Sequence, residues 1–448
     1  MAISARFQVA RADLLGLLAV FPILLRIAKI VSCVSNERLN IRYCLLMKKH
    51  RSLYFVGIAL LVAAGTAISQ SSKRPVNWEG LPDPFHTPSA SNRPKVVERP
   101  NDASLSVPPG FHVEEYMSGF EARPRFMILG PNQEILLTDS GARRIANGRV
   151  YVIRDKTAKK IIEGLDRPYG LAMHEDWLYV AEPTSVKRYK YDAQNMTVEG
   201  SGEEIISLEG HGTGHWTRTL LFDQDHKKLY TTVGSGSNID LGEDPKRATV
   251  LRSNPDGSDL EVVATGLRNT IGLRWFPGSD SLWGAVQERD GLGDDLANDF
   301  LVNIQQGAFY GWPYAYNGPH EEPRHKDVAP GKVKNTRYPD VLLGAHVAVL
   351  DILFYTGKQF PEEYRNGLFL AFHGSWNRSK RTGYSVTYIP FKKGQPTSGP
   401  QDFLRGWMLG EEQREVWGRP VGLLQMPDGS VLVSDDGGRK LWRISYVG

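Results

Sequence analysis

Short apolar segments separated by turns recur through residues 110–448, and one arrangement of them repeats six times. Each copy begins with a polar or proline-containing lead-in, continues as an apolar strand and returns through a turn as a second apolar strand. The copies begin near residues 123, 167, 215, 268, 347 and 419, and the first three intervals are 44, 48 and 53 residues. Four-stranded propeller blades repeat about every 40–50 residues. The pattern therefore predicts an all-β, six-bladed β-propeller over residues 110–448.

Two further features of the pattern concern how the ring is built. The last two intervals lengthen to about 79 and 72 residues, which indicates insertions, with residues 308–345 expected to form one on the loop face. Phe111–Tyr116 and Leu441–Tyr446 are expected to pair, because joining the chain ends removes open sheet edges. No stretch has the 3.6-residue periodicity of a helical solenoid.

The segment ahead of the repeats is predicted to be a leader and a linker. Residues 47–70 place the basic start KKHR before an apolar run of about 16 residues and a small polar end, as in a secretory signal or a retained membrane anchor. Residues 1–46 are expected to be an extra leader or the product of a start codon assigned too early. Residues 71–109, rich in Pro, Ser and Asn, are predicted to be a linker. We therefore expect an exported protein, periplasmic or extracellular.

Composition and charge narrow the class of partner. The chain of 448 residues is 41% hydrophobic and 23% charged, which is typical of globular proteins and excludes a disordered or fibrous one. Its net charge of +4 arises in the leader, because residues 71–448 hold 45 basic and 48 acidic side chains. Both cysteines, Cys33 and Cys44, also lie in the leader. A slightly acidic, cysteine-free domain argues against a nucleic-acid partner and against a disulfide framework.

Candidate chemistry gathers at the heads of the repeats. In a propeller these positions surround one mouth of the central channel, so they become neighbours in space. They are Arg123, Arg125, Arg167, His215, Arg218, Arg268, Asn269 and Arg419. Because like charges repel, this ring needs either acids of the protein, such as Glu182, Glu288 or Asp435, or an anionic ligand. His215 is suited to take a proton near neutrality or to serve as a structural hydrogen-bonding group.

Two other segments could add to such a site. Gln287–Asp295 combines carboxylates, glycine turns and exposed carbonyls, which suit a hard cation such as Ca²⁺, although without EF-hand spacing. Phe372–Tyr384 (FHGSWNRSKRTGY) carries three cations on a turn after an apolar strand. His211 lies four residues before His215, but its glycine-rich surroundings favour a loop over a metal pair on a helix. Motifs for nicotinamide, ATP or serine-hydrolase chemistry are absent from the sequence.

Together these segments resemble the soluble sugar dehydrogenases that depend on pyrroloquinoline quinone (PQQ), in particular the glucose/sorbosone group and its sorbosone-type branch. The resemblance covers about residues 108–447. It rests on His215 before a strand ending KLYTTVG, on Arg268-Asn269 before GLRW, and on GLGDDLAND followed by Gly311-Trp-Pro. The segments AFHGSWNRSKRTGYSV and GRPVGLLQMPDGSVLVSDDGGRKLWRISY complete it.

The resemblance implies a reaction and a set of roles. The protein would oxidise a sugar or sugar-aldehyde hydrate with PQQ and Ca²⁺ and pass electrons to an external acceptor, a cytochrome or a quinone. His215 would remove the proton of the substrate hydroxyl, Arg268 would stabilise negative charge on the quinone oxygen, and Asn269 would hold the same edge. The groups implied to hold the cofactor carboxylates are Arg218, Arg419 and Arg378 or Lys380. Main-chain oxygens near Arg289 and Asp290 would bind Ca²⁺.

Three departures from the family pattern point away from glucose as the substrate. Gly214 stands where glucose-oxidising members have an acid, Asp290-Gly291 replaces a Gly-Pro pair, and Trp417 replaces a cofactor arginine. Two other functions stay open on the same architecture. One is a Ca²⁺-dependent lactonase or hydrolase, which would need inward carboxylates and amides on several blades. The other is a non-catalytic propeller that binds a partner or an acidic glycan through its basic mouth.

Overall fold

A computed structural model describes residues 74–142, 145–210 and 214–448. The leader predicted for residues 1–46 and 47–70 lies outside the described residues, as does His211. Within the described ranges, no helix is long and apolar enough to cross a membrane.

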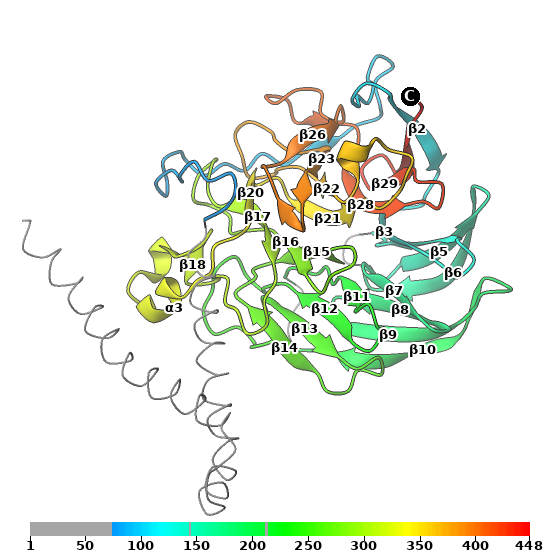
Figure 1. Cartoon of the computed structure of the whole chain (residues 1–448), viewed down its shortest axis with the longest axis horizontal. Coiled ribbons are helices and arrows are strands. Elements are labelled where there is room, and N and C mark those ends of the chain that lie inside the picture. The colour runs from blue at the N-terminus through cyan, green and yellow to red at the C-terminus, as the bar shows by residue number, and fades with distance from the viewer. Residues whose placement is uncertain (1–73, 143–144, 211–213) are drawn as a thin grey trace, which may run out of the picture. The chain divides into compact units, whose positions relative to one another are not determined.

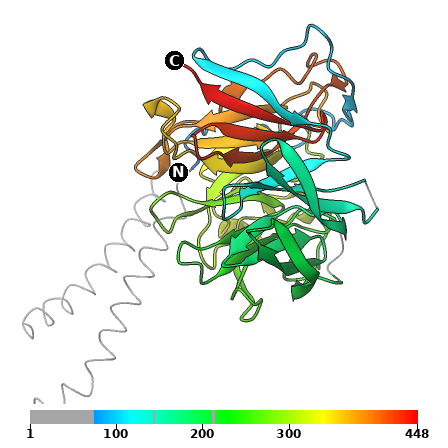
Figure 2. The ribbon, with the colours of Figure 1, turned by 90° about the vertical axis from the view of Figure 1, so that its right-hand side faces the viewer.

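Six four-stranded antiparallel sheets are arranged in a ring, which confirms the predicted β-propeller (Figures 1 and 2). The first three blades follow the chain in order. Their strands are β3 (Pro124–Leu129), β4 (Ile135–Asp139), β5 (Gly148–Arg154), β6 (Thr157–Leu165), β7 (Leu171–His174), β8 (Trp177–Glu182), β9 (Ser185–Asp192), β10 (Thr197–Ser207), β11 (Leu220–Phe222), β12 (Leu229–Val233), β13 (Thr249–Ser253) and β14 (Glu261–Thr265).

The later blades take their fourth strand from further along the chain or from its start. The fourth blade is β15 (Thr270–Trp275), β16 (Leu282–Val286), β17 (Asn298–Asn303) and β20 (Val341–Ala345). The fifth is β21 (Val349–Phe354), β22 (Leu368–Phe372), β23 (Ser385–Ile389) and β26 (Gln401–Leu404). The sixth is β28 (Pro420–Gln425), β29 (Val431–Asp435), β30 (Lys440–Tyr446) and β2 (Phe111–Ser118). Each repeat head predicted from the sequence precedes or begins the first strand of a blade.

Pairing of the two ends of the propeller closes the ring as predicted. Strand β2 pairs antiparallel with β30, with Phe111 opposite Tyr446 and Ser118 opposite Lys440. The sixth sheet therefore combines residues from both ends of the repeat region, so its outer edge is supplied by the first strand of the propeller sequence.

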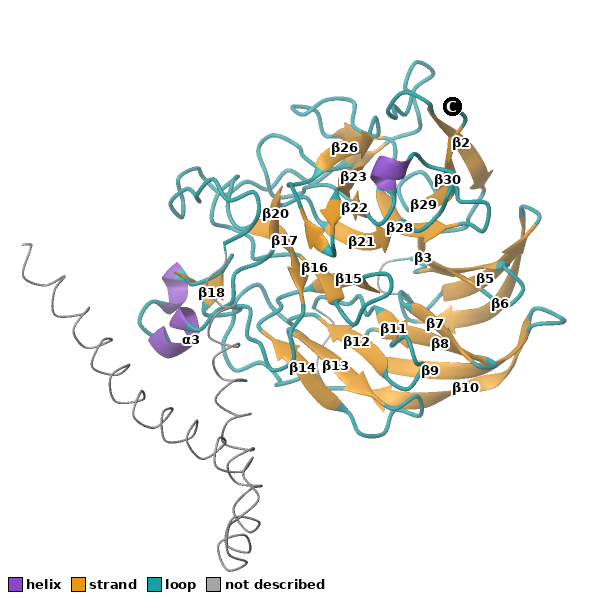
Figure 3. Cartoon of the chain, in the orientation of Figure 1, coloured by secondary structure: helices purple, strands orange, loops and turns teal. Residues whose placement is uncertain are grey.

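The predicted insertion lies between β17 and β20. It contains β18 (Ala315–Tyr316), β19 (His320–Glu321), the short 3-10 helix η1 (Pro323–His325) and helix α3 (Pro330–Lys334). Figure 3 shows these short helical turns near β18, in a molecule whose described part is built mostly of strands and loops. Residues 341–345, which the sequence assigned to the insertion, are instead the fourth strand of the blade. The remaining short elements are η2 (Glu362–Tyr364) and the paired strands β24 (Phe391–Lys392) and β25 (Gln395–Pro396).

The core lies between neighbouring blades. Inner strands such as β12 (LYTTV) and β29 (VLVSD) are buried along their whole length, because each sheet is covered on both faces. β-branched and aromatic side chains suit such pleated, covered surfaces. Trp283 of β16 and Leu370 of β22, for example, belong to one buried cluster that joins the fourth and fifth blades.

Residues 74–109, predicted to be a linker, pack along the propeller. Strand β1 (Lys95–Val96) pairs in parallel with β27 (Glu415–Val416), which precedes the sixth blade. Asn77 donates from Nδ2 to the carbonyl of Leu342 at 2.8 Å, and Thr87 accepts at Oγ1 from the amide of Asp294 at 2.7 Å. The segment thus contacts loops and strands of the later blades and belongs to the same compact unit.

Candidate functional site

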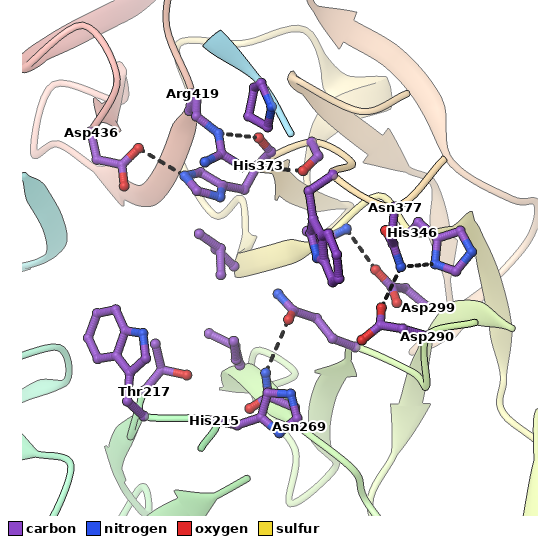
Figure 4. Close-up of a pocket in the computed structure, with 18 of the residues that line it drawn as sticks. His215, Thr217, Asn269, Asp290, Asp299, His346, His373, Asn377, Arg419 and Asp436 are labelled. Atoms are coloured by element: carbon purple, nitrogen blue, oxygen red, sulfur yellow. Dashed lines mark hydrogen bonds and ion pairs between the residues drawn. The ribbon is translucent and has the colours of Figure 1, made fainter. Parts of the chain in front are cut away.

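A cavity of about 650 Å³ lies among the loops that lead into the first strands of the blades (Figure 4). Predicted repeat heads supply much of its wall: Arg123, Arg125, His215, Arg268, Asn269 and Arg419. Figure 4 shows His215 and Asn269 on one side and His373, Arg419 and Asp436 on the opposite side. The repeat geometry therefore brings together residues separated by up to about 300 positions in the sequence.

His215 is held as a neutral imidazole. Its Nδ1 lies 2.9 Å from the carbonyl oxygen of Ser235 and 2.9 Å from that residue's Oγ. A carbonyl only accepts, so Nδ1 carries the hydrogen and Nε2 keeps its lone pair. Burial, followed by the neighbouring Arg268 guanidinium, lowers the pKa of His215 well below its ordinary value of 6.5. An unprotonated Nε2 is the group that a general base requires.

Arg268 is fixed by neighbours on two loops. It donates from Nε and Nη2 to Asn238 at 3.1 and 2.9 Å, and from Nη1 to the carbonyl of Glu288 at 2.6 Å. Its Nη2 also pairs with Oδ2 of Asp290 at 2.9 Å, and the Arg268 side chain is only 3% exposed. These bonds hold the guanidinium beside His215 in one orientation.

Asn269 presents an unsatisfied acceptor within the site. Its Nδ2 donates to Oε1 of Gln287 at 3.1 Å, and Gln287 in turn donates to the carbonyl of Val349 at 2.9 Å. The Asn269 Oδ1 is buried and has no hydrogen-bond partner within the described residues. Buried polar atoms are normally satisfied, so this oxygen is suited to a donor on a bound molecule.

The opposite wall is built on a buried carboxylate. Asp436 accepts from Nε2 of His373 at 2.8 Å and forms an ion pair with Arg125. Burial lowers the pKa of His373 to about 4, so the imidazole is neutral, whereas His373, Arg125 and Arg419 together hold the pKa of Asp436 below its ordinary range against its burial. Arg419 donates to the carbonyls of His373 and Gly374 at 3.2 and 3.3 Å. Two guanidinium groups therefore face this side of the cavity.

A third wall carries two carboxyl groups with raised pKa. Burial raises the pKa of Glu288 from 4.5 to about 7 and that of Asp299 from 3.8 to about 7. The Glu288 Oε1 is buried without a hydrogen-bond partner in the described part of the chain. Each group therefore carries only part of its charge near neutrality, and a nearby cation would favour full ionisation.

A hydrogen-bonded chain leads from this wall to the loop after β22. His346 has its Nε2 2.9 Å from the carbonyl of Gly293, and its Nδ1 lies 3.0 Å from Nδ2 of Asn377. The same Asn377 amide donates to Oδ1 of Asp290, as Figure 4 shows. Asp290 is thereby held by Arg268 on one side and by Asn377 on the other.

Four predicted ligand residues lie outside the cavity lining. Arg218 is fully buried and donates to the carbonyls of His215, Thr217 and Pro183, so it supports the His215 loop from behind. Arg289 donates from Nη2 to Glu322 at 3.2 Å. Arg378 pairs with Asp295 at 2.6 Å and Lys380 with Glu412 at 3.0 Å, and neither lines the cavity. Arg167 likewise pairs with Asp166 at 2.8 Å.

The departures from the family pattern have local structural reasons. A Cβ at Gly214 would lie 2.0 Å from the carbonyl oxygen of Gly236, so this backbone admits no acid there. Gly291 has φ +88°, a conformation that favours glycine. Trp417 is buried and donates from Nε1 to the carbonyl of Gly406 at 2.8 Å, outside the cavity lining.

The sequence did not identify several residues of the site. Asp435, named as a partner for the arginines, lies beneath the cavity and accepts from the indole N–H groups of Trp407 and Trp442, each at 3.1 Å. The next residue, Asp436, is the one that faces Arg125. The doubled acid in SVLVSDD was the only available signal. Other lining residues that the sequence did not single out include Arg93, Pro94, Val96, Asp299, His346, His373, Trp376 and Asn377.

The chemistry of the lining suits an anionic, polar small molecule. Five arginines and four carboxylic acids line the cavity, and two of the four acids have a pKa of about 7. The volume falls in the range of roughly 300–1,000 Å³ that small-molecule sites occupy. In the part of the chain that the structure describes, no group of three or more His, Cys, Asp or Glu side chains is placed to hold a metal ion. A cation here would therefore need main-chain oxygens or atoms of a bound cofactor in addition to any single carboxylate.

Comparison with known proteins gives the family. A family model described as TrAA12-like matches residues 105–317 and 320–446. An uncharacterized protein of Borreliella burgdorferi is 30% identical over 358 residues, which cover 77% of this chain and 91% of that protein. A PQQ-dependent pyranose dehydrogenase of Coprinopsis cinerea is 23% identical over 400 residues, covering 74% of this chain but only 53% of that enzyme. The chain thus spans about half the length of this curated relative.

Two solved structures share the fold. The holo form of the PQQ domain of the Coprinopsis cinerea enzyme is 21% identical, with a TM-score of 0.64, and covers 78% of this chain and 98% of that chain. A calcium structure of a Trichoderma reesei enzyme of carbohydrate-active family AA12 is 20% identical, with a TM-score of 0.64, and covers 79% and 99%. The resemblance to PQQ-dependent sugar dehydrogenases is confirmed by the family and sequence matches.

Proposed function

The chain belongs to the TrAA12-like family, and from this membership and its arginine-lined cavity we propose that it is a PQQ-dependent sugar dehydrogenase. The observation that carries the proposal is a neutral histidine, His215, that lines one cavity with Arg268, the unsatisfied Asn269 oxygen and four further arginines. A base beside clustered cations is the arrangement that hydroxyl oxidation with an anionic cofactor requires.

His215 is the proposed base. The hydrogen bond from Nδ1 to Ser235 fixes the ring and leaves Nε2 to accept the proton of the sugar hydroxyl that is oxidised. Its lowered pKa keeps Nε2 unprotonated across the neutral range. Arg218, behind the loop, holds the His215 carbonyl and so helps to position the ring without touching the substrate.

The residues that line the cavity would hold PQQ by its charges. Arg123, Arg125 and Arg419 would pair with its carboxylates, since guanidinium groups form strong, directional bonds with carboxylates. Arg268 and Asn269 would hold the opposite edge, close to His215. When bound, PQQ would accept the two electrons of the oxidation, with Ca²⁺ as the polarising cation. The Glu288 Oε1 and main-chain oxygens near Arg289 and Asp290 are the proposed protein ligands of that cation.

The substrate, the electron acceptor and the cellular location are proposed from similarity to related enzymes. The related pyranose dehydrogenase suggests a sugar substrate, and the sorbosone-type segments favour a sugar aldehyde such as sorbosone over glucose. The tight packing at Gly214 supports this choice, because an acidic side chain, as in the glucose-oxidising pattern, would not fit there. Electrons would pass to an external cytochrome or quinone. We also propose that the leader exports the protein to the periplasm or the extracellular space, either as a cleaved signal or as a retained membrane anchor.

Reconstitution tests the proposal. The full chain is incubated with PQQ and Ca²⁺, and reduction of an artificial electron acceptor is followed with a panel of aldoses and 2-ketoaldoses; matched samples lack PQQ, Ca²⁺ or sugar. We expect acceptor reduction that requires both PQQ and sugar. Failure to bind PQQ together with lactone hydrolysis in Ca²⁺ alone would replace the proposal with the lactonase function. Binding of an acidic glycan with no turnover of any kind would favour a non-catalytic propeller.

A further inference from the structure

One wall of the cavity comes from outside the six blades. Arg93, Pro94 and Val96 line it, although they belong to the segment that precedes the propeller. The backbone of this segment is fixed on both sides: the amide of Asn92 donates to the carbonyl of Trp376 at 2.7 Å, and Arg414 donates from Nε to the carbonyl of Arg93 at 3.0 Å. The segment is therefore a fixed part of the cavity mouth.

Arg93 lies beside an exposed aromatic ring at this mouth. The carbon of its guanidinium group is 5.6 Å from the ring centroid of Trp376, which also lines the cavity. Trp376 is 39% exposed, whereas its neighbours Ser375 and Asn377 are 1% and 6% exposed. An aromatic side chain that is open beside a cavity offers a flat apolar face on which the ring of a bound molecule can lie.

The charge of Arg93 also lacks a partner within the protein. Among the described residues, no carboxylate lies within ion-pair distance of Arg93, whereas Arg125 and Arg268 in the same cavity pair with Asp436 and Asp290. Arg93 is also exposed, while those two arginines are buried. The buried arginines are thus suited to bind a cofactor deep in the cavity. Arg93, at the mouth, is suited to bind the substrate that enters after the cofactor.

We propose that Arg93 and Trp376 bind the substrate sugar and select one that carries a carboxylate, such as a uronic acid. The indole would lie against the apolar face of the pyranose ring, and the guanidinium would take the carboxylate in a two-bond pairing. The inference rests on the proposed function and names the substrate class of that same site, a sugar with a carboxylate in place of the neutral sugar aldehyde that the sorbosone-type segments favour. Asn377, which follows Trp376 and holds Asp290, links this pair to Arg268 at the centre.

The test compares matched neutral and acidic sugars in the full-length enzyme loaded with PQQ and Ca²⁺. Galactose with galacturonate and glucose with glucuronate are assayed for wild type, Arg93→Gln, Arg93→Lys and Trp376→Ala. Lys95→Gln, which removes an exposed cation from the same segment, serves as the matched control. Lys95 pairs with Glu415 at 3.4 Å and does not line the cavity.

We expect the wild type to favour the uronates by about 10-fold or more in kcat/KM, the size expected of one charge-assisted pairing. Arg93→Gln should remove that preference by raising KM for the uronates, Arg93→Lys should keep part of it, and Trp376→Ala should raise KM for both sugars of a pair. The affinity for PQQ, measured by fluorescence quenching, should stay within 2-fold or so of wild type in all variants.

Either of two results would overturn the inference. One is an Arg93→Gln enzyme with the same KM values as wild type for every sugar. The other is an Arg93→Gln enzyme that loses PQQ affinity at unchanged KM, which would assign Arg93 to the cofactor. If the wild type oxidises no sugar, the proposed function fails. Calorimetric binding of galacturonate and galactose to the same variants then decides the inference independently, since equal affinities for both sugars would refute it.

Discussion

Replacing His215 with asparagine removes the proposed base while keeping its structural bond. The Asn amide can still donate toward the Ser235 carbonyl, which His215 Nδ1 contacts at 2.9 Å, but it has no counterpart to Nε2. If that one bond weakens, the loss of folding free energy is about 0.5–1.5 kcal/mol. Loss of a general base lowers kcat by about 10²- to 10⁴-fold, which corresponds to about 3–5 kcal/mol of transition-state stabilisation. We therefore expect a folded, PQQ-binding protein with almost no turnover.

The assay for this variant separates chemistry from folding and binding. Turnover under single-turnover conditions, thermal unfolding and PQQ affinity are measured together, and His112→Gln, which removes an exposed histidine from β2, is the control. Because the pKa of His215 is lowered by burial and by Arg268, wild-type kcat/KM should not fall by half near pH 6.5 but only at distinctly lower pH. A His215→Asn enzyme that keeps more than about one third of wild-type kcat with PQQ bound would refute the role.

Further predictions concern the walls of the cavity. The folded state raises the pKa of Glu288 from 4.5 to about 7, so it retains a proton that the unfolded chain releases, and stability is lost as pH rises through this window. Glu288→Gln should therefore gain about 3 kcal/mol relative to wild type between pH 4.5 and pH 8 in denaturant unfolding of the apo protein; equal pH profiles would contradict this. Asp435→Ala should cost at least about 3 kcal/mol, because the indole N–H groups of Trp407 and Trp442 lose their acceptor, and a Tm within about 2 °C of wild type would exclude that role.

The propeller fold could be predicted from the sequence because each blade repeats the same pattern of apolar strands and turns. Each blade repeats the same strand order, and insertions lengthen only the later repeats, so the recurring pattern placed His215, Arg268 and Arg419 at one mouth. The same reasoning could not place Arg378 and Lys380, because they lie in a loop and not at the head of a repeat. In the structure they pair with Asp295 and Glu412 and do not line the cavity. Loop conformation follows no period.

Two other parts of the site depend on contacts that the sequence pattern does not encode. Of the adjacent acids Asp435 and Asp436, only the second faces the arginines, because strand β29 ends between them. Arg93 reaches the cavity through pairing between β1 and β27, segments about 320 residues apart. Its surroundings in the sequence have the composition of a linker, so only the fold reveals its place.

Reduction of bound PQQ by a sugar is the decisive test of dehydrogenase activity in this protein. The full chain is loaded with PQQ and Ca²⁺, excess cofactor is removed, and the absorption of the bound quinone is followed anaerobically while a sugar is added. We expect that about one equivalent of sugar reduces one equivalent of bound PQQ, and that His215→Asn binds PQQ but reduces it at least about 100-fold more slowly. A protein that does not retain PQQ, or that retains it in the oxidised form with every sugar tried, would not be a PQQ-dependent sugar dehydrogenase.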